Sequence, residues 1–147
     1  MEINFSKSLD LSSPTDLLVL PVIQDMVWVN PLVKLLDEAL GGAVRQLAKS
    51  EDFKAKSSSS LSFNTMDKIG AQRVLLLGLG RAEEISGENF RRASGLAADA
   101  LRKYHAGRTV FVCQAIEGRD LAIEQLVGAV VEGLKLGLYR FEKYKSG

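Results

Sequence analysis

The chain has 147 residues, of which 46% are apolar and 25% are charged. This composition is typical of one soluble globular domain and argues against disorder. The net charge of +1 gives no overall attraction for nucleic acid or acidic substrates. No apolar run reaches the ~18 residues of a membrane span, and "MEINFSKSLD" lacks the features of a signal peptide. A single cysteine, Cys113, cannot form an internal disulfide. A cytoplasmic location without membrane contact is therefore expected.

The first third of the sequence predicts two strands and a helix. The apolar runs "EINFSK" and "DLLVLPVI" are separated by turn-forming residues, so both are expected to be strands. Pro21 lacks the N–H that strand pairing needs, which puts the second strand near a sheet edge or ends its pairing there. Asn30 and Pro31 are typical of a helix start. The predicted helix buries one face and ends at Gly41 and Gly42; that face consists of Leu32, Leu35, Leu36 and Leu40.

The middle of the sequence predicts a hairpin, followed by a buried strand. "EDFKAKSSSSLSFNTM" contains two short alternating runs around a serine cluster, which predicts a β-hairpin turning at residues 57–60. A disordered linker is the alternative. "QRVLLLGLG" is fully apolar, as is typical of a strand that is covered on both faces.

The last third predicts a helix, a strand and a final helix. Apolar or small residues recur at helical spacing from 88 to 105, which predicts a helix. "RTVFVCQA" is predicted to be a second buried strand, in which Cys113 packs as an inert thiol. Residues 120–138 are predicted to form the last helix. Strands that alternate with helices predict an α/β fold with a mostly parallel or mixed sheet and helices on both faces. The last helix has only a narrow polar strip. Its broad apolar surface is therefore expected to pack against partners on two sides, unless the helix lies centrally within its own domain. That strip consists of Glu124, Gly128, Glu132 and Lys135.

No catalytic or metal-binding motif can be assembled from the sequence. The single histidine, His105, is expected in the last turn of its helix, where a partial positive charge suits the helix dipole. No nucleophile motif or metal-ligand spacing surrounds it. We therefore predict no catalytic, metal-binding or cofactor-binding residue in this chain.

Two features have both a functional and a structural interpretation. Gly78 and Gly80 follow a buried strand, as in a phosphate-binding turn, but Glu83 stands where the dinucleotide motif needs a third glycine. A sharp exit from the sheet is the simpler explanation. The basic side chains of the following helix would suit nucleic acid or merely a solvated face, and Asp99 interrupts them; they are Arg91, Arg92, Arg102 and Lys103.

The sequence resembles the N-terminal domain of the leucyl (cytosol) aminopeptidases. "RVLLLGLGRAEEISGENFRRASGLAADALRKY" is similar to a strand, GLG turn and arginine-bearing helix of that domain, and "DFKAK" to the strand before its hairpin. "VEGLKLGLYRFEKYKS" is similar to its closing helix and the exit toward the catalytic domain. The match covers nearly the whole chain. One departure is Ala55, where the family more often has glycine.

The resemblance implies a macro-domain-like fold, a three-layer mixed α/β sheet flanked by helices. It implies a single N-terminal domain at residues 1–138, and at residues 139–147 the start of a linker toward a catalytic domain absent from this chain. The family's two divalent metal ions (Zn or Mn) and its peptidase residues belong to that catalytic domain, so none is carried over. The exit segment is then expected to contact the catalytic domain through Leu134, Leu138, Tyr139, Phe141 and Tyr144.

By the same resemblance, the parent enzyme is a cytoplasmic leucyl aminopeptidase that removes N-terminal residues from peptides and assembles as a homohexamer. Some bacterial members bind DNA, which this nearly neutral sequence does not support. The alternative is a free-standing macro-like module that binds a nucleotide or ADP-ribose, because "VWVNPLVKLLDEALGGAV" resembles the ligand-binding stretch of such domains. Pro31 after Asn30 departs from that pattern.

Overall fold

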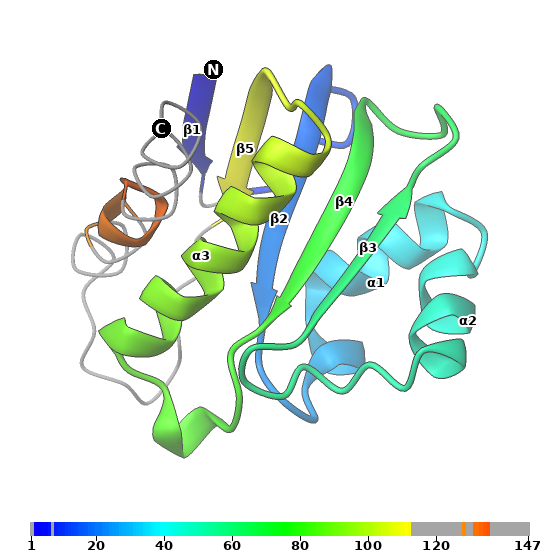
Figure 1. Cartoon of the computed structure of the whole chain (residues 1–147). Coiled ribbons are helices and arrows are strands. Elements are labelled where there is room, and N and C mark those ends of the chain that lie inside the picture. The colour runs from blue at the N-terminus through cyan, green and yellow to red at the C-terminus, as the bar shows by residue number, and fades with distance from the viewer. Residues whose placement is uncertain (1, 7, 113–127, 129–130, 136–147) are drawn as a thin grey trace.

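The computed structural model of the chain describes residues 2–6, 8–112, 128 and 131–135 (Figure 1). These residues form one five-stranded sheet in the order β1-β5-β2-β4-β3. All neighbouring strands are parallel except β3, which is antiparallel to β4. The strands are β1 (Glu2–Ser6), β2 (Thr15–Val22), β3 (Ser60–Asn64), β4 (Ala71–Gly78) and β5 (Arg108–Val112). The predicted α/β class with a mixed sheet is confirmed.

Helices cover both faces of the sheet. The long helix α3 (Gly87–Lys103) crosses one face, and α1 (Pro31–Ala39) and α2 (Ala43–Ser50) lie on the other (Figure 1). Two short 3-10 helices, η1 (Val27–Val29) and η2 (Ala82–Glu84), follow β2 and β4. Of the predicted last helix, Gly128 and residues 131–135 are helical, and the remainder lies outside the described residues. Among the described residues, none of the helices combines the length and apolar character that crossing a bilayer requires.

The core has two layers because the central strands are apolar on both faces. In β2, Leu17 and Val19 pack toward α3, whereas Leu18 and Leu20 pack toward α1 and α2. This alternation follows from the two-residue period of a strand. The fully apolar runs that the sequence shows are therefore the strands with a helical layer on each side.

The prediction for Pro21 is wrong about its place in the sheet. β2 is central, and its pairing with β4 continues through Pro21, which lies opposite Leu77. On the other side, the described pairing with β5 covers Leu17 to Val19.

The predicted hairpin at residues 57–60 is also wrong. The segment before β3 is not a strand, since Ala55 and Ser58 have left-handed backbone angles of φ 64° and 65°. The hairpin instead joins β3 to β4 and turns at residues 65–68, where the N–H of Lys68 donates to the carbonyl of Thr65 (3.1 Å). Its two central residues lack the glycine or asparagine that would have marked the turn in the sequence. The φ of Ala55 also explains why glycine suits that position.

The start and end of α1 are as predicted, but its buried face is shifted. Asn30 Oδ1 accepts hydrogen bonds from the N–H groups of Leu32 (2.9 Å) and Val33 (3.4 Å), so it caps the helix. Val33, Leu36 and Leu40 are buried, whereas Leu35 is 39% exposed. The apolar pattern therefore identified the helix and misplaced one side chain of its buried face.

Candidate functional site

The turn after β4 is the candidate phosphate-binding turn, but its backbone amides donate hydrogen bonds to other parts of the fold. The N–H of Gly78 donates to Ser59 (2.8 Å) and that of Gly80 to Ala55 (3.0 Å), both at carbonyl oxygens. The N–H between them, that of Leu79, donates to Val22 (2.9 Å). A Cβ on Gly78 would overlap the carbonyl of Lys56. These glycines therefore let two chain segments meet, as the simpler interpretation predicted.

The second glycine pair has a similar local role. Gly41 and Gly42 have φ of 64° and 85°, and their N–H groups donate to the carbonyls of Glu38 (3.1 Å) and Asp37 (2.8 Å). This arrangement ends α1 and satisfies its last carbonyls. The carboxylate of Asp37 also accepts from the N–H of Arg45 (2.9 Å) in the first turn of α2. The predicted helix end at these glycines is confirmed.

His105 lies just beyond α3 and not in its last turn, which corrects the sequence prediction. Its φ is 51°, and its N–H and that of Ala106 donate to the carbonyls of Arg102 (3.3 Å) and Leu101 (3.1 Å). This is the hydrogen-bond pattern that closes a helix through a left-handed residue. No three His, Cys, Asp or Glu side chains of the described part lie together as metal ligands, and Cys113 falls outside that part.

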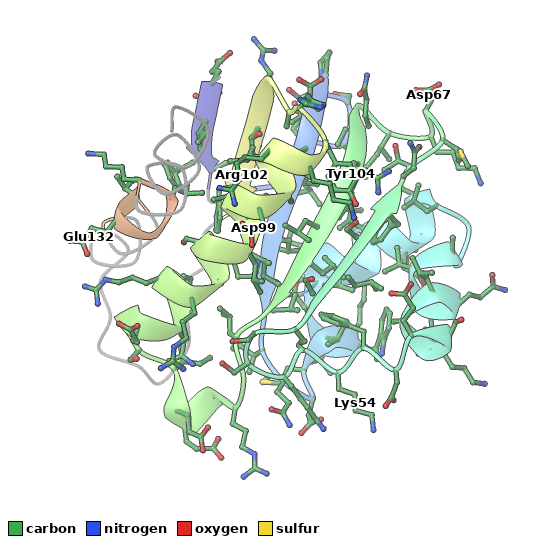
Figure 2. The ribbon with its side chains drawn as sticks, viewed as in Figure 1. Lys54, Asp67, Asp99, Arg102, Tyr104 and Glu132 are labelled. Atoms are coloured by element: carbon green, nitrogen blue, oxygen red, sulfur yellow. The ribbon has the colours of Figure 1, made fainter. Side chains whose placement is uncertain are left out.

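The basic side chains of α3 are largely neutralised by carboxylates. Arg91 pairs with Glu88 (3.1 Å) and with Glu132 (2.9 Å) of the helical segment 131–135. Arg92 also approaches Glu88 (3.8 Å). Figure 2 shows Arg102 and Asp99 together on α3, where they form a further pair. The helix therefore carries alternating charges, which gives no continuous basic strip for nucleic acid.

A close contact joins α3 to the segment 131–135. A Cβ built on Gly133 would lie 2.6 Å from the carbonyl oxygen of Arg91 and 2.6 Å from the Cβ of Ser94. Leu134 follows it into the core, where it is only 4% exposed. The Arg91–Glu132 pair lies beside this contact. This contact was not predicted from the sequence, although an isolated glycine in an apolar helix often marks close packing.

A second cluster lies where the end of α3 meets β3 and β4. The guanidinium carbon of Arg73 stacks 3.9 Å from the ring centroid of Tyr104, and the Tyr104 hydroxyl lies 3.2 Å from Ser62 Oγ. This hydrogen bond, with the charges of Arg73 and Lys103, lowers the pKa of Tyr104. The cluster makes one side of β3 polar and cationic, whereas Leu61 and Phe63 of the same strand are buried on the other side.

The predicted interdomain residues fall mostly outside the described part. Leu138, Tyr139, Phe141 and Tyr144 are not among the described residues. Leu134 packs in the core and leaves little of its side chain for another domain to contact. The interdomain role of this set stays a prediction.

The sequence and the fold both match known proteins. The profile described as "Cytosol aminopeptidase family, N-terminal domain" matches residues 19–147. The chain belongs to this family. It is 38% identical over 112 residues to a probable cytosol aminopeptidase of Geotalea uraniireducens, which covers 76% of this chain and 22% of that protein. It is 37% identical over 135 residues to one of Syntrophotalea carbinolica, with 91% and 27% covered.

The chain thus spans about a quarter of the length of these cytosol aminopeptidases. Its fold is similar to that of a tomato leucine aminopeptidase variant, with a TM-score of 0.77, 23% identity and coverage of 93% of this chain and 28% of the other. It is also similar to the macrodomain of Mycobacterium tuberculosis DarG, with a TM-score of 0.72, 10% identity and coverage of 91% and 90%. The predicted family and the macro-domain-like fold are both confirmed.

Proposed function

We propose that this chain is the non-catalytic N-terminal domain of a leucyl aminopeptidase, with a role in assembly or regulation of the parent enzyme. The observation that carries the proposal is the family match, which is to the N-terminal domain and covers residues 19–147. The parent enzyme is a two-metal exopeptidase that releases N-terminal residues from peptides. Its two divalent metal ions, Zn or Mn, are held by a C-terminal catalytic domain, and it works as a cytoplasmic homohexamer.

The residues of the described part do not fit the metal pair, since no three possible ligands lie together in it. Two metal ions of a hydrolase need several converging carboxylates. Several of the described carboxylates have structural partners instead: Glu132 pairs with Arg91, and Asp37 accepts a hydrogen bond from the N–H of Arg45. This chain's contribution is therefore proposed to be structural contact with the rest of the enzyme.

The contact between α3 and the segment 131–135 supports a role at the domain boundary. Gly133 and Leu134 fix this segment against α3, and the sequence continues from it toward Leu138, Tyr139, Phe141 and Tyr144. We propose that these four side chains contact the catalytic domain. A helix held firmly at one end orients the chain that follows it.

Peptidase assays test the non-catalytic assignment. The purified 147-residue chain is expected to leave leucine p-nitroanilide intact in the presence of added Zn²⁺ or Mn²⁺, at the rate of protein-free controls. Hydrolysis that a chelator abolishes would contradict the proposal. The reading frame after Gly147 gives an independent test: a catalytic domain encoded there supports the parent assignment, and a stop codon directly after Gly147 contradicts it.

A macro-like module that binds ADP-ribose is the second candidate, because the DarG macrodomain matches over 90% of its length. The local geometry favours the first candidate. The amides of Gly78 and Gly80 donate to protein carbonyls, and the side chain of Asn30 caps α1. A pyrophosphate needs free amides at such turns. Calorimetric titration with ADP-ribose is expected to show no binding tighter than millimolar. A micromolar dissociation constant would favour the second candidate.

A further inference from the structure

The strand β3 presents an open edge. It ends the sheet and pairs only with β4 among the described strands. The bonds from Thr65 N–H to the Gln72 carbonyl (3.0 Å) and from Gly78 N–H to the Ser59 carbonyl (2.8 Å) fix the alternation of the antiparallel ladder. The N–H and C=O groups of Ser60, Ser62 and Asn64 therefore point away from β4. Among the described residues, no backbone group pairs with them.

This edge lacks the usual protection against a further strand. Natural edge strands are commonly blocked by proline, by lysine or by a bulge. β3 has the sequence SLSFN, with neither proline nor charge, and its register with β4 is continuous over five residue pairs. An extended chain could thus continue the sheet by main-chain hydrogen bonds.

An apolar groove lies beside the same edge and is lined by residues of α2, of β3 and of the turn that follows β3. Its volume is about 370 Å³, which is within the range of ligand sites. Leu40, Leu47 and Phe63 supply apolar lining, together with Met66 of the turn, which is 76% exposed. Lys68 is the single charged residue among those that line the groove. It makes no ion pair within the part of the chain that the structure describes.

We propose that β3 and α2 form a docking groove for an extended peptide segment of a partner protein. The segment adds to β3 as a new strand, through the free groups of Ser60, Ser62 and Asn64. Every second side chain faces α2, so an apolar side chain enters the groove and an acidic group beside it pairs with Lys68. This inference does not depend on the function proposed above.

A second copy of this chain fits the groove less well than such a peptide. If two β3 strands paired, the side chains facing the helical layer would be Leu61 and Phe63 of each copy. Both are already buried under their own helices, so neither is free to fill the groove of the other copy. Lys68 likewise would find no acidic partner on the β3 strand of a second copy, because β3 carries no carboxylate.

Fluorescence anisotropy with the acetylated, labelled peptide TVLVE tests the proposal on the full chain. Its leucine and glutamate share one face of a strand. We expect saturable binding that weakens at least threefold for TVLVK and for TVSVE, which remove the acidic and the apolar group. Lys68→Glu is expected to weaken TVLVE binding and to improve TVLVK binding, whereas the matched Lys34→Glu on α1 leaves both unchanged. No binding of TVLVE at millimolar peptide, or equal binding of TVLVE and TVLVK, would overturn the proposal.

Proline at position 62 tests strand addition itself. Because the Ser62 N–H points outward, Ser62→Pro removes a free donor without removing a bond to β4. It is expected to abolish peptide binding, and Ser62→Ala, which loses only the hydroxyl contacts with Tyr104 and Arg73, is expected to retain it. Unchanged binding by a folded Ser62→Pro chain would refute strand addition.

A second groove variant and a sedimentation measurement address two remaining outcomes, namely a Ser62→Pro chain that does not fold and self-association through β3. If circular dichroism shows that Ser62→Pro does not fold, Ala43→Trp replaces it, because Ala43 lines the groove and is exposed. Peptide binding that persists in Ala43→Trp would contradict the groove. Sedimentation tests the other occupant: self-association that Ser62→Pro removes would assign the edge to a second copy and overturn the peptide proposal.

Discussion

His105 occupies a backbone position that suits glycine better. Its left-handed φ of 51° closes α3 through the bonds to Arg102 and Leu101. In the left-handed region of backbone angles, a residue with a Cβ has an unfavourable steric contact that glycine avoids. The chain therefore keeps a small local strain at the junction between α3 and β5.

Replacing this residue should stabilise the protein. We expect His105→Gly to raise the free energy of unfolding by roughly 0.5–1 kcal/mol, because the steric cost exceeds the added entropy of the unfolded chain. Urea denaturation measures the change, with His105→Ala as the control that keeps a Cβ and gains nothing. A lower midpoint for His105→Gly would contradict the assigned helix end.

Asp16 links the starts of β2 and β5. Its Oδ2 accepts hydrogen bonds from the N–H groups of Gly107 (2.7 Å) and Arg108 (2.9 Å). These two bonds, that of Arg108 first, lower the pKa of the Asp16 carboxyl. A lowered folded-state pKa means that the ionised carboxylate contributes stability above the pKa of the unfolded chain, and that this contribution is lost as the pH falls through the folded-state value.

Asp16→Asn should therefore lower stability at neutral pH and have less effect in acid. The expected cost at pH 7 is about 1 kcal/mol or less, because the carboxylate is accessible to solvent. The difference between wild type and variant should shrink below about pH 4, near the ordinary pKa of aspartate. Urea midpoints measured from pH 7 to pH 3 give this difference, with Glu38→Gln on the exposed side of α1 as control. A difference that is constant with pH would rule out the charge as its cause.

At the scale of elements, the packing of the segment 131–135 on α3 is decided by one glycine. A Cβ at Gly133 would approach the backbone of Arg91, which cannot move without shifting α3. Gly128 belongs to the same predicted helix, but a Cβ there meets nothing within 4 Å. The two glycines therefore separate the effect of helix propensity from the effect of packing.

Alanine at these two positions should have opposite effects. Gly133→Ala is expected to cost about 1–3 kcal/mol through overpacking, and Gly128→Ala to stabilise by up to about 1 kcal/mol through helix propensity. Thermal or urea unfolding measures both. If Gly133→Ala is as stable as Gly128→Ala, the close contact with α3 is wrong.

At the scale of the whole molecule, the C-terminal part of the sequence contains apolar residues with two different roles. Leu134 belongs to the core of the sheet and α3. Leu138 and Phe141 are proposed to contact the catalytic domain. The first kind should govern folding of this chain, and the second its association.

Serine substitutions distinguish these roles. Leu134→Ser should lower the free energy of unfolding by about 2–5 kcal/mol, as is usual for a buried leucine. The double variant Leu138→Ser with Phe141→Ser should leave the urea midpoint nearly unchanged and reduce any self-association seen by sedimentation. If the double variant instead unfolds the chain, these side chains belong to its own core and the interdomain proposal fails.

Features that depend on near neighbours in the chain could be predicted from the amino-acid sequence. The cap at Asn30, the helix end at Gly41 and Gly42, and the apolar strands β2, β4 and β5 follow from residues a few positions apart, so they were predicted correctly. The absence of a full dinucleotide motif at Gly78 and Gly80 was also evident from spacing alone. Local hydrogen bonds and the periodicity of strands and helices depend on residues close together in the chain, so they can be predicted from the sequence.

The tertiary structure alone decided what depends on residues far apart in the chain. Pro21 lies in a central strand because β4 and β5 flank it, and the segment around Ala55 is not a strand because it crosses the end of β4 at Gly78. The Gly133 contact and the groove between β3 and α2 likewise join segments that no local pattern relates. Sheet order and helix packing are set by burial summed over the whole chain, and this sum is not readable from any single stretch of it.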